Sequence, residues 1–152
     1  MSERSKQLAA MFNNSKERQG IQNELDLRNA KLLDESFLRM QAEINSHIER
    51  LCAELNQEPE IGDILRCDFS DKETKVTRTD TGNVLSAKFD PFRHSVGFVC
   101  PKPTNFKYSI TVKKGVGDSW YYADGDDGSI GDKLGWLADK VLRALLGLNS
   151  SG

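Results

Sequence analysis

The segment 124–132 has the composition of a cation-binding loop, because it combines four aspartates with three glycines. Calcium loops use clustered carboxylate oxygens and need glycine at the sharp turn. The spacing does not fit: with Gly128 at the glycine position of an EF-hand loop, the closing glutamate would be Leu134. We therefore predict no metal site, and a strand-to-helix turn in which Ser129 caps the helix and Asp132 completes a capping box. The sequence leaves open whether the carboxylates of this segment bind a cation in some other arrangement.

The supply of catalytic bases is small, since His47 and His94 are the only histidines. A serine or cysteine hydrolase needs a nucleophile, a base and an orienting group together in space. His94 and Cys100 would lie about 20 Å apart on an extended strand, which is too far for proton transfer. The sequence holds no phosphate-binding or dinucleotide-binding glycine motif either. We predict no catalytic residue and no cofactor, so an enzyme is disfavoured.

The three cysteines, Cys52, Cys67 and Cys100, are widely spaced and form no C-x-x-C pair. This arrangement predicts buried thiols rather than a disulfide framework or a zinc cluster. No apolar run approaches the roughly 18 residues that a membrane span requires. A formal charge of -2 and an apolar fraction of 38% are typical of a folded protein. We expect a cytoplasmic protein without a membrane segment.

The elements that would position these groups divide the chain into a helical arm, 1–57, and a domain, 58–152. The segment 21–56 contains neither proline nor glycine and predicts one long helix. Asn13, Asn14, Ser15 and Gly20 interrupt the pattern upstream. Residues 1–20 are therefore expected either to form a separate helical turn or two, or to stay mobile.

One apolar stripe follows the predicted helix at spacings of three and four residues, close to a heptad seam. A helix over 21–56 would span about 54 Å, whereas a six-residue strand spans about 20 Å. A small sheet would leave part of the helix uncovered, so the stripe either packs on its own domain or pairs with another copy or a different protein. The candidate partner-binding residues are Phe37, Met40, Ile44, Ile48, Leu51 and Leu55.

The segment 58–152 predicts an antiparallel meander of five or six strands followed by an amphipathic helix, which gives the α+β class. Phe106, Tyr108, Ile110 and Val112 alternate with polar residues, as in a half-buried strand. Short reversals separate the strands, and parallel pairing would need longer crossovers. The last helix should pack its leucine-rich face on one side of the sheet. On a helix starting near Leu134, Trp136 falls on the opposite, polar face.

Trp136 is therefore a further candidate for partner binding, because tryptophan is a favoured interface anchor. The alternative is that its ring folds against the arm. The leading hypothesis is a non-enzymatic module for protein interaction or oligomerisation, using the long helix and Trp136. The partner would be a second copy of the chain or another protein.

Nucleic-acid binding is the alternative hypothesis, since residues 66–114 hold ten Lys or Arg against five Asp or Glu. The side chains expected on the wet face of the sheet are Lys75, Arg78, Lys107 and Lys113. A third hypothesis is a small-ligand pocket under the C-terminal helix, lined by Trp120, Tyr122 and Phe98. Filled cores more often account for such aromatic clusters.

Overall fold

The computed structural model describes residues 2–124, 129–131 and 133–148. The chain forms two compact units, Met1–Leu32 and Leu33–Gly152. Helix α1 (Glu3–Gln57) begins in the first unit and ends in the second. The boundary between the units thus falls inside the helix, whereas the sequence pattern placed it after residue 57. The described residues include no helix long and apolar enough to cross a membrane.

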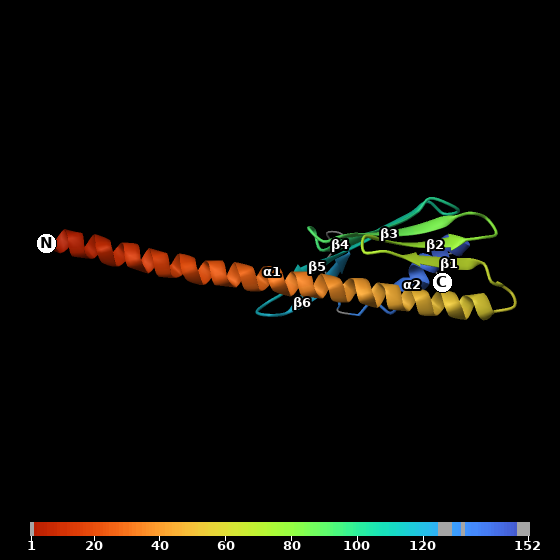
Figure 1. The fold of residues 1–152 in the computed structure, drawn as a ribbon, viewed down its shortest axis with the longest axis horizontal. Helices are drawn as coiled ribbons and strands as arrows, with labels where there is room; N and C mark the ends of the chain where they lie inside the picture. The colour runs from red at the N-terminus through yellow and green to blue at the C-terminus, as the bar shows by residue number, and fades with distance from the viewer. Residues whose placement is uncertain (1, 125–128, 132, 149–152) are drawn as a thin grey trace. The chain divides into compact units, whose positions relative to one another are not determined.

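The second unit is built on a single antiparallel sheet whose strands follow one another in chain order (Figure 1). This confirms the predicted α+β class and the meander. The sheet has seven strands rather than five or six, because the segment 129–131 pairs with its predecessor instead of forming only a turn. The strands are β1 (Leu65–Phe69), β2 (Glu73–Arg78), β3 (Val84–Asp90), β4 (Ser95–Cys100), β5 (Phe106–Lys114), β6 (Trp120–Asp124) and β7 (Ser129–Gly131).

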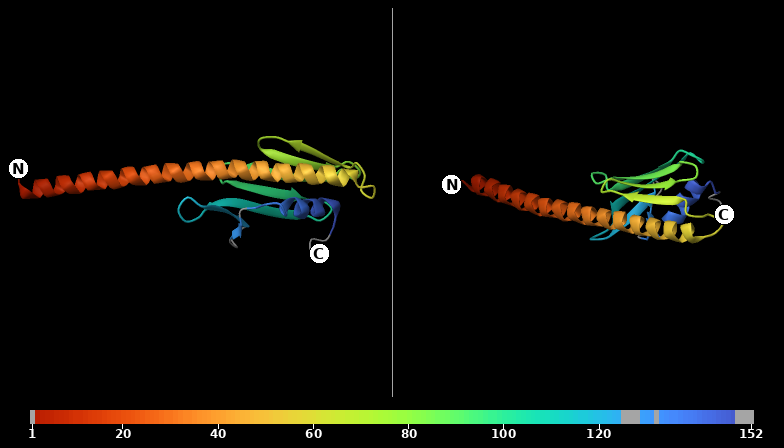
Figure 2. Two further views of the ribbon diagram at one scale, coloured as in Figure 1. Left: turned by 90° about the horizontal axis from the view of Figure 1, so that it is seen from below. Right: turned by 45° about the vertical axis from the view of Figure 1, so that its right-hand side comes forward.

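The core lies on one face of the sheet, against residues 33–57 of α1 and the short helix α2 (Leu137–Leu146) (Figure 2). Alternation along the strands sends one set of side chains into this core and the other to the outer face. Val76, Val96, Phe98 and Tyr122 are completely buried on the inner face. The C-terminal helix packs on the sheet as predicted.

Side-chain hydrogen bonds fix α1 to the rest of the second unit. The Asn45 carboxamide accepts a hydrogen bond from the buried Thr74 hydroxyl at 2.6 Å. The Asn56 side chain exchanges two hydrogen bonds of 2.9 Å with the backbone of Leu65 at the start of β1. These contacts satisfy polar groups that would otherwise be costly to bury.

The helix α1 begins earlier than the predicted 21–56, since Asn13, Asn14, Ser15 and Gly20 lie within it. Each of these residues costs about 1 kcal/mol or less in a helix interior, and the surrounding Ala, Lys, Glu, Gln and Leu are good helix formers. Isolated unfavourable residues therefore do not end the helix. The described residues 3–20 are helical rather than confined to a turn or two.

The predicted cap of the last helix is wrong. Ser129 belongs to β7, where its hydroxyl accepts a hydrogen bond from the Gly131 amide at 3.2 Å. Helix α2 begins only at Leu137, and Trp136 occupies its N-cap without a side-chain capping bond. Residues 125–128 and Asp132, on which the cation and capping-box hypotheses depend, lie outside the described residues. The helix ends at Gly147, whose φ of 76° gives the left-handed conformation that glycine adopts at low cost.

Candidate functional site

The apolar stripe predicted to bind a partner lies in the core of the second unit. Phe37 is 4% exposed, and Met40, Ile44 and Ile48 are at most 1% exposed. Leu51 and Leu55 are half-buried against the same core. Of the two alternatives left open by the sequence, the structure has the stripe packed on its own sheet. Phe37, Met40, Ile44 and Ile48 are therefore not available as a free surface, and Leu51 and Leu55 are only partly accessible.

Most of the exposed large apolar side chains of α1 belong to the first unit, and Leu38, which is 62% exposed, belongs to the second. Residues 2–28 are exposed throughout, and six of them are large and apolar. Leu8, Met11, Phe12, Ile21, Leu25 and Leu27 are 44% to 73% exposed. Burying a side chain of this size is worth about 1.5–3 kcal/mol, so exposed placement of several on one helix is unfavourable without a partner.

Three of these six residues, together with Leu32, follow a heptad pattern. If Leu8 is given position a, Met11, Leu25 and Leu32 fall at position d. Phe12 and Ile21 then flank this seam on its two sides, and Leu27 lies on the opposite side of the helix. The remaining a and d positions of residues 8–32 are Ser15, Arg18, Gln22 and Asn29.

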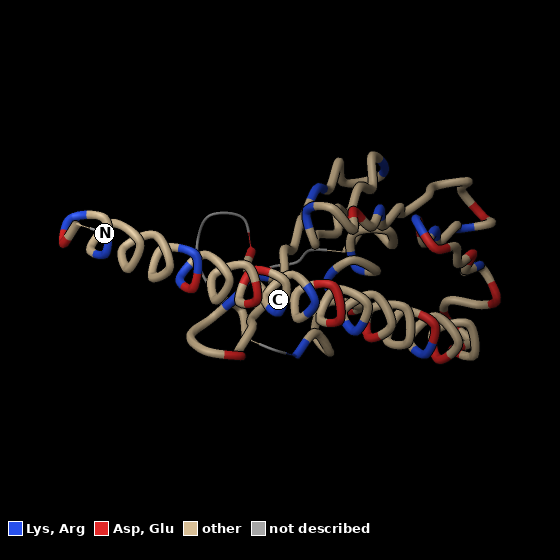
Figure 3. Tube along the Cα trace, turned by 60° about the vertical axis from the view of Figure 1, so that its left-hand side comes forward, with Lys and Arg blue, Asp and Glu red and all other residues tan. Residues whose placement is uncertain are grey.

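The charge distribution of α1 is uneven at its N-terminal end. Residues 7–15 contain no Lys, Arg, Asp or Glu, although charges of both signs occur along the rest of the helix (Figure 3). This is the longest uncharged run in α1, and it contains Leu8, Met11 and Phe12. A solvated helix surface normally carries more charge, so this run resembles a contact surface.

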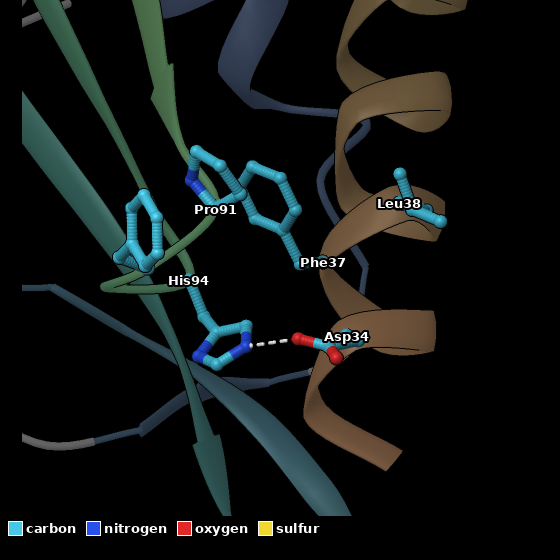
Figure 4. A pocket seen from close by; sticks show the side chains of 6 residues that line it. Asp34, Phe37, Leu38, Pro91 and His94 are labelled. Atoms are coloured by element: carbon cyan, nitrogen blue, oxygen red, sulfur yellow. Dashed lines mark hydrogen bonds and ion pairs between the residues drawn. The ribbon is translucent and has the colours of Figure 1, made fainter. Parts of the chain in front are cut away.

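An apolar hollow of about 500 Å³ lies between the first turns of α1 in the second unit and the turn joining β3 to β4 (Figure 4). The His94 imidazole is hydrogen-bonded at its rim to the Asp34 carboxylate, with Nε2 and Oδ1 2.7 Å apart. The other lining residues are Phe37, Leu38, Pro91 and Phe92. The Phe92 side chain is 95% exposed, and the Asp90 carboxylate holds its turn by accepting hydrogen bonds from the Phe92 and Arg93 amides.

The hollow lacks the groups that a His–Asp pair would need for covalent catalysis. None of the described lining residues is a serine, threonine, cysteine or lysine, so no hydroxyl, thiol or amine nucleophile accompanies the imidazole there. Within the described part of the chain, no three or more His, Cys, Asp or Glu residues are grouped as metal ligands would be. The pair instead links α1 to the β3–β4 turn.

The four basic residues of the nucleic-acid hypothesis do not share one face of the sheet. Lys75 and Lys107 belong to a row of outer-face residues across β1–β5, and Lys113 pairs with Tyr121 on the same face. The Lys75 ammonium lies 3.2 Å from the Glu73 carboxylate. Arg78 points to the inner side, where it contacts Asp80 at 2.8 Å and donates to the Leu145 carbonyl at 3.3 Å.

Trp136 lies against the sheet rather than on a polar helix face. Its ring meets the Tyr108 ring edge to face at 6.2 Å, and its Nε1 donates to the Lys133 carbonyl at 3.2 Å. The Lys140 ammonium is 4.7 Å from the centre of the same Tyr108 ring. Trp136 is still 41% exposed, so it is partly packed and partly accessible.

The aromatic residues of the pocket hypothesis are mainly core residues. Phe98 and Tyr122 are completely buried, and Trp120 packs on Tyr122 with ring centres 5.0 Å apart. The Arg39 guanidinium lies 5.8 Å from the centre of the Trp120 ring. The three rings fill the interior under the helices.

Comparison with models of known protein families, with curated proteins and with solved structures found no match. Function must therefore be argued from surfaces of this chain. The sequence carried a signal for the exposed seam, namely the uncharged run and the leucines in heptad positions, which the Asn, Ser and Gly residues obscured. It carried none for the Asp34–His94 pair, whose members are 60 residues apart.

Proposed function

We propose that this chain is a non-enzymatic oligomerisation module whose helical segment 3–32 pairs with the same segment of a second copy. The single observation that supports this proposal best is the exposed apolar seam of that segment. The proposal keeps the long helix as the interacting element but moves the contact from residues 37–55 to residues 8–32.

Length and periodicity support helix pairing. Residues 8–32 provide about three and a half heptads, which is the range in which a coiled coil becomes recognisable. An isolated helix of this size is only marginally stable in water, because tertiary packing supplies most helical stability. A second helix on the seam would bury Leu8, Met11, Leu25 and Leu32 and so stabilise both copies.

The distribution of residues along the seam favours a second copy as the occupant. Leu8 and Met11 stand at one end, and Leu25 and Leu32 stand at the other with Asn29 between them. The a and d positions in the middle are the polar residues Ser15, Arg18 and Gln22. Two copies of such a segment can pair apolar ends with apolar ends and a polar centre with a polar centre. The seam is therefore complementary to itself, as a symmetric dimer interface requires.

The test compares variants of exposed residues of the first unit, because these should leave the second unit folded. Leu8→Glu combined with Leu25→Glu places charges in the seam and should raise the dimer dissociation constant more than about tenfold, which corresponds to 1.4 kcal/mol. Leu27→Glu is the matched control, since Leu27 is 73% exposed on the opposite side of the helix. Sedimentation equilibrium gives the dimer dissociation constant of the native chain and of the two variants.

A dimer that both variants leave unchanged would place the contact elsewhere on the chain. An equal rise in the dimer dissociation constant with Leu27→Glu would argue against the heptad seam as the contact. The circular dichroism spectrum of each variant above the dissociation constant checks that the sheet is retained.

The proposal also assigns the chain to the cytoplasm. Its support is the presence of three free cysteines, Cys52, Cys67 and Cys100, which are typical of a reducing compartment. A dimer built on helix pairing alone needs no disulfide.

A further inference from the structure

Two of the three cysteines are neighbours in space although they belong to different elements. Cys52 lies on α1 and is buried, whereas Cys67 lies on β1 and is half-buried. Both side chains belong to the core of the second unit, and each shifts the pKa of the other. Cys100 has a separate environment at the end of β4, where its thiol donates to the Lys102 carbonyl at 3.2 Å.

The connection between α1 and β1 explains why the two sulfurs meet. Asn56 holds the helix beside the strand through its two hydrogen bonds to the Leu65 backbone. Cys52 lies one helical turn before Asn56, and Cys67 lies two residues beyond Leu65 on the same face of the strand. One turn of helix and two residues of strand advance by similar distances, about 6 Å. Helix α1 and strand β1 run in opposite directions on the two sides of the turn that joins them (Figure 1). Both steps therefore lead to about the same level.

The two thiols differ in reactivity. The neighbouring Cys52 thiol lowers the pKa of Cys67, while burial and the nearby Glu49 carboxylate oppose this effect. The neighbouring Cys67, together with burial, raises the pKa of Cys52. Cys67 is also the more exposed of the two. It therefore has the character of the attacking thiolate, and Cys52 that of the resolving thiol.

We infer that Cys52 and Cys67 are an oxidation site, at which a peroxide converts the two thiols into a disulfide that links α1 to β1. The inference depends on the fold of the second unit and not on the pairing of residues 3–32.

The chemistry balances with hydrogen peroxide as the oxidant. The Cys67 thiolate attacks one peroxide oxygen, the O–O bond breaks, and a Cys67 sulfenic acid and hydroxide result. The Cys52 sulfur then attacks the Cys67 sulfur, the S–O bond breaks, and the thiol proton of Cys52 leaves with the departing hydroxide as water. Two thiols lose two electrons, and the peroxide is reduced to two molecules of water.

The disulfide would close a short loop that contains the only connection between α1 and the sheet. Such a link restricts the unfolded chain, so the oxidised form should melt at a temperature higher by roughly 5–10 °C. The link would fasten the last turns of α1 to the edge strand β1, which has a neighbouring strand on one side only.

The test treats the full chain with hydrogen peroxide, blocks remaining thiols with N-ethylmaleimide and analyses tryptic peptides by mass spectrometry. Trypsin cleaves after Arg50, Arg66 and Lys72, so Cys52 and Cys67 fall on separate peptides, 51–66 and 67–72. We expect these two peptides to be joined, with two hydrogen atoms lost and Cys100 fully alkylated. Dithiothreitol should separate them and reverse the shift in melting temperature.

Variants identify the pair independently of its effect on stability. Cys67→Ser should abolish the linked peptides, and Cys100→Ser, the matched control, should leave them unchanged. Full alkylation of Cys52 and Cys67 after peroxide treatment would overturn the inference. Linkage of either residue to Cys100, or to the cysteine of a second chain, would overturn it as well.

Discussion

The Nε2 atom of His94 lies 2.7 Å from Oδ1 of Asp34, which joins the β3–β4 turn to the first turns of α1 in the second unit. His94 adopts a φ of 52°, a left-handed conformation that is uncommon for residues other than glycine and asparagine. The Phe37 ring packs against the same imidazole at 6.2 Å. Both contacts hold the β3–β4 turn against the first turns of the packed stretch of α1.

Removing this link should cost little stability because the Asp34 side chain is 68% exposed. We expect Asp34→Ala to lower the free energy of unfolding by less than about 1 kcal/mol, as measured by urea denaturation. Asp34→Asn retains an acceptor oxygen and should retain most of the stability. Equal losses in the two variants would show that the hydrogen bond is not the cause.

Asn56 should contribute more, because its carboxamide satisfies two backbone groups of Leu65. Asn56→Ala leaves both groups without their partner and should lower the free energy of unfolding by about 1–3 kcal/mol. Gln57→Ala changes an exposed neighbour at the end of the same helix and is the control. Similar stabilities of the two variants in denaturant titrations would contradict the assigned role of Asn56.

Tyr108 should make stability depend on alkaline pH. Burial and the hydrogen bond that its hydroxyl donates to Asp124 at 2.8 Å raise the pKa of Tyr108 above its ordinary value of about 10. Above the ordinary pKa the unfolded chain loses this proton while the folded chain keeps it. The stability contribution is therefore complete below about pH 10 and falls as the pH rises toward the folded pKa.

The measurement is the melting temperature of the native chain and of Tyr108→Phe between about pH 8 and pH 11. The difference in melting temperature between the native chain and Tyr108→Phe should shrink or change sign as the pH increases. A constant difference across this range would mean that Tyr108 titrates alike in both states.

Trp136 contributes a ring contact with Tyr108, and the proposed interface does not include it. Trp136→Ala should lower the free energy of unfolding by about 0.5–1.5 kcal/mol beyond the lost buried area, with no change in molar mass. Trp136→Phe keeps an aromatic edge and should recover part of the loss. A change in molar mass with unchanged stability would instead return Trp136 to the interface.

Much of the second unit could be predicted from the sequence because side-chain alternation and turn residues are local signals. The six strands from β1 to β6 lie where apolar residues alternate between clear reversals. β7 was missed because a run rich in aspartate and glycine is more typical of a loop. The start of α2 was misplaced because Leu134 fits the helical period although it precedes the helix.

The partner of an amphipathic stripe is not encoded in its period. Met40, Ile44 and Ile48 were recognised as one face, but a helix presents the same spacing to a sheet as to another helix. Upstream, Asn13, Asn14, Ser15 and Gly20 were interpreted as interruptions of the helix, so Leu8, Met11 and Phe12 were not included in an apolar face. The Cys52–Cys67 contact depends on how two elements pack, and spacing along the chain does not reveal it.

The most direct test of the proposed function is light scattering of the purified chain over a range of concentrations, in a reducing buffer that excludes disulfide-linked species. Pairing through residues 3–32 predicts a molar mass that rises with concentration to twice the 17.0 kDa of one chain. A mass of one chain at every concentration, up to about 1 mM, would contradict the account, since the exposed seam would then remain without a second copy.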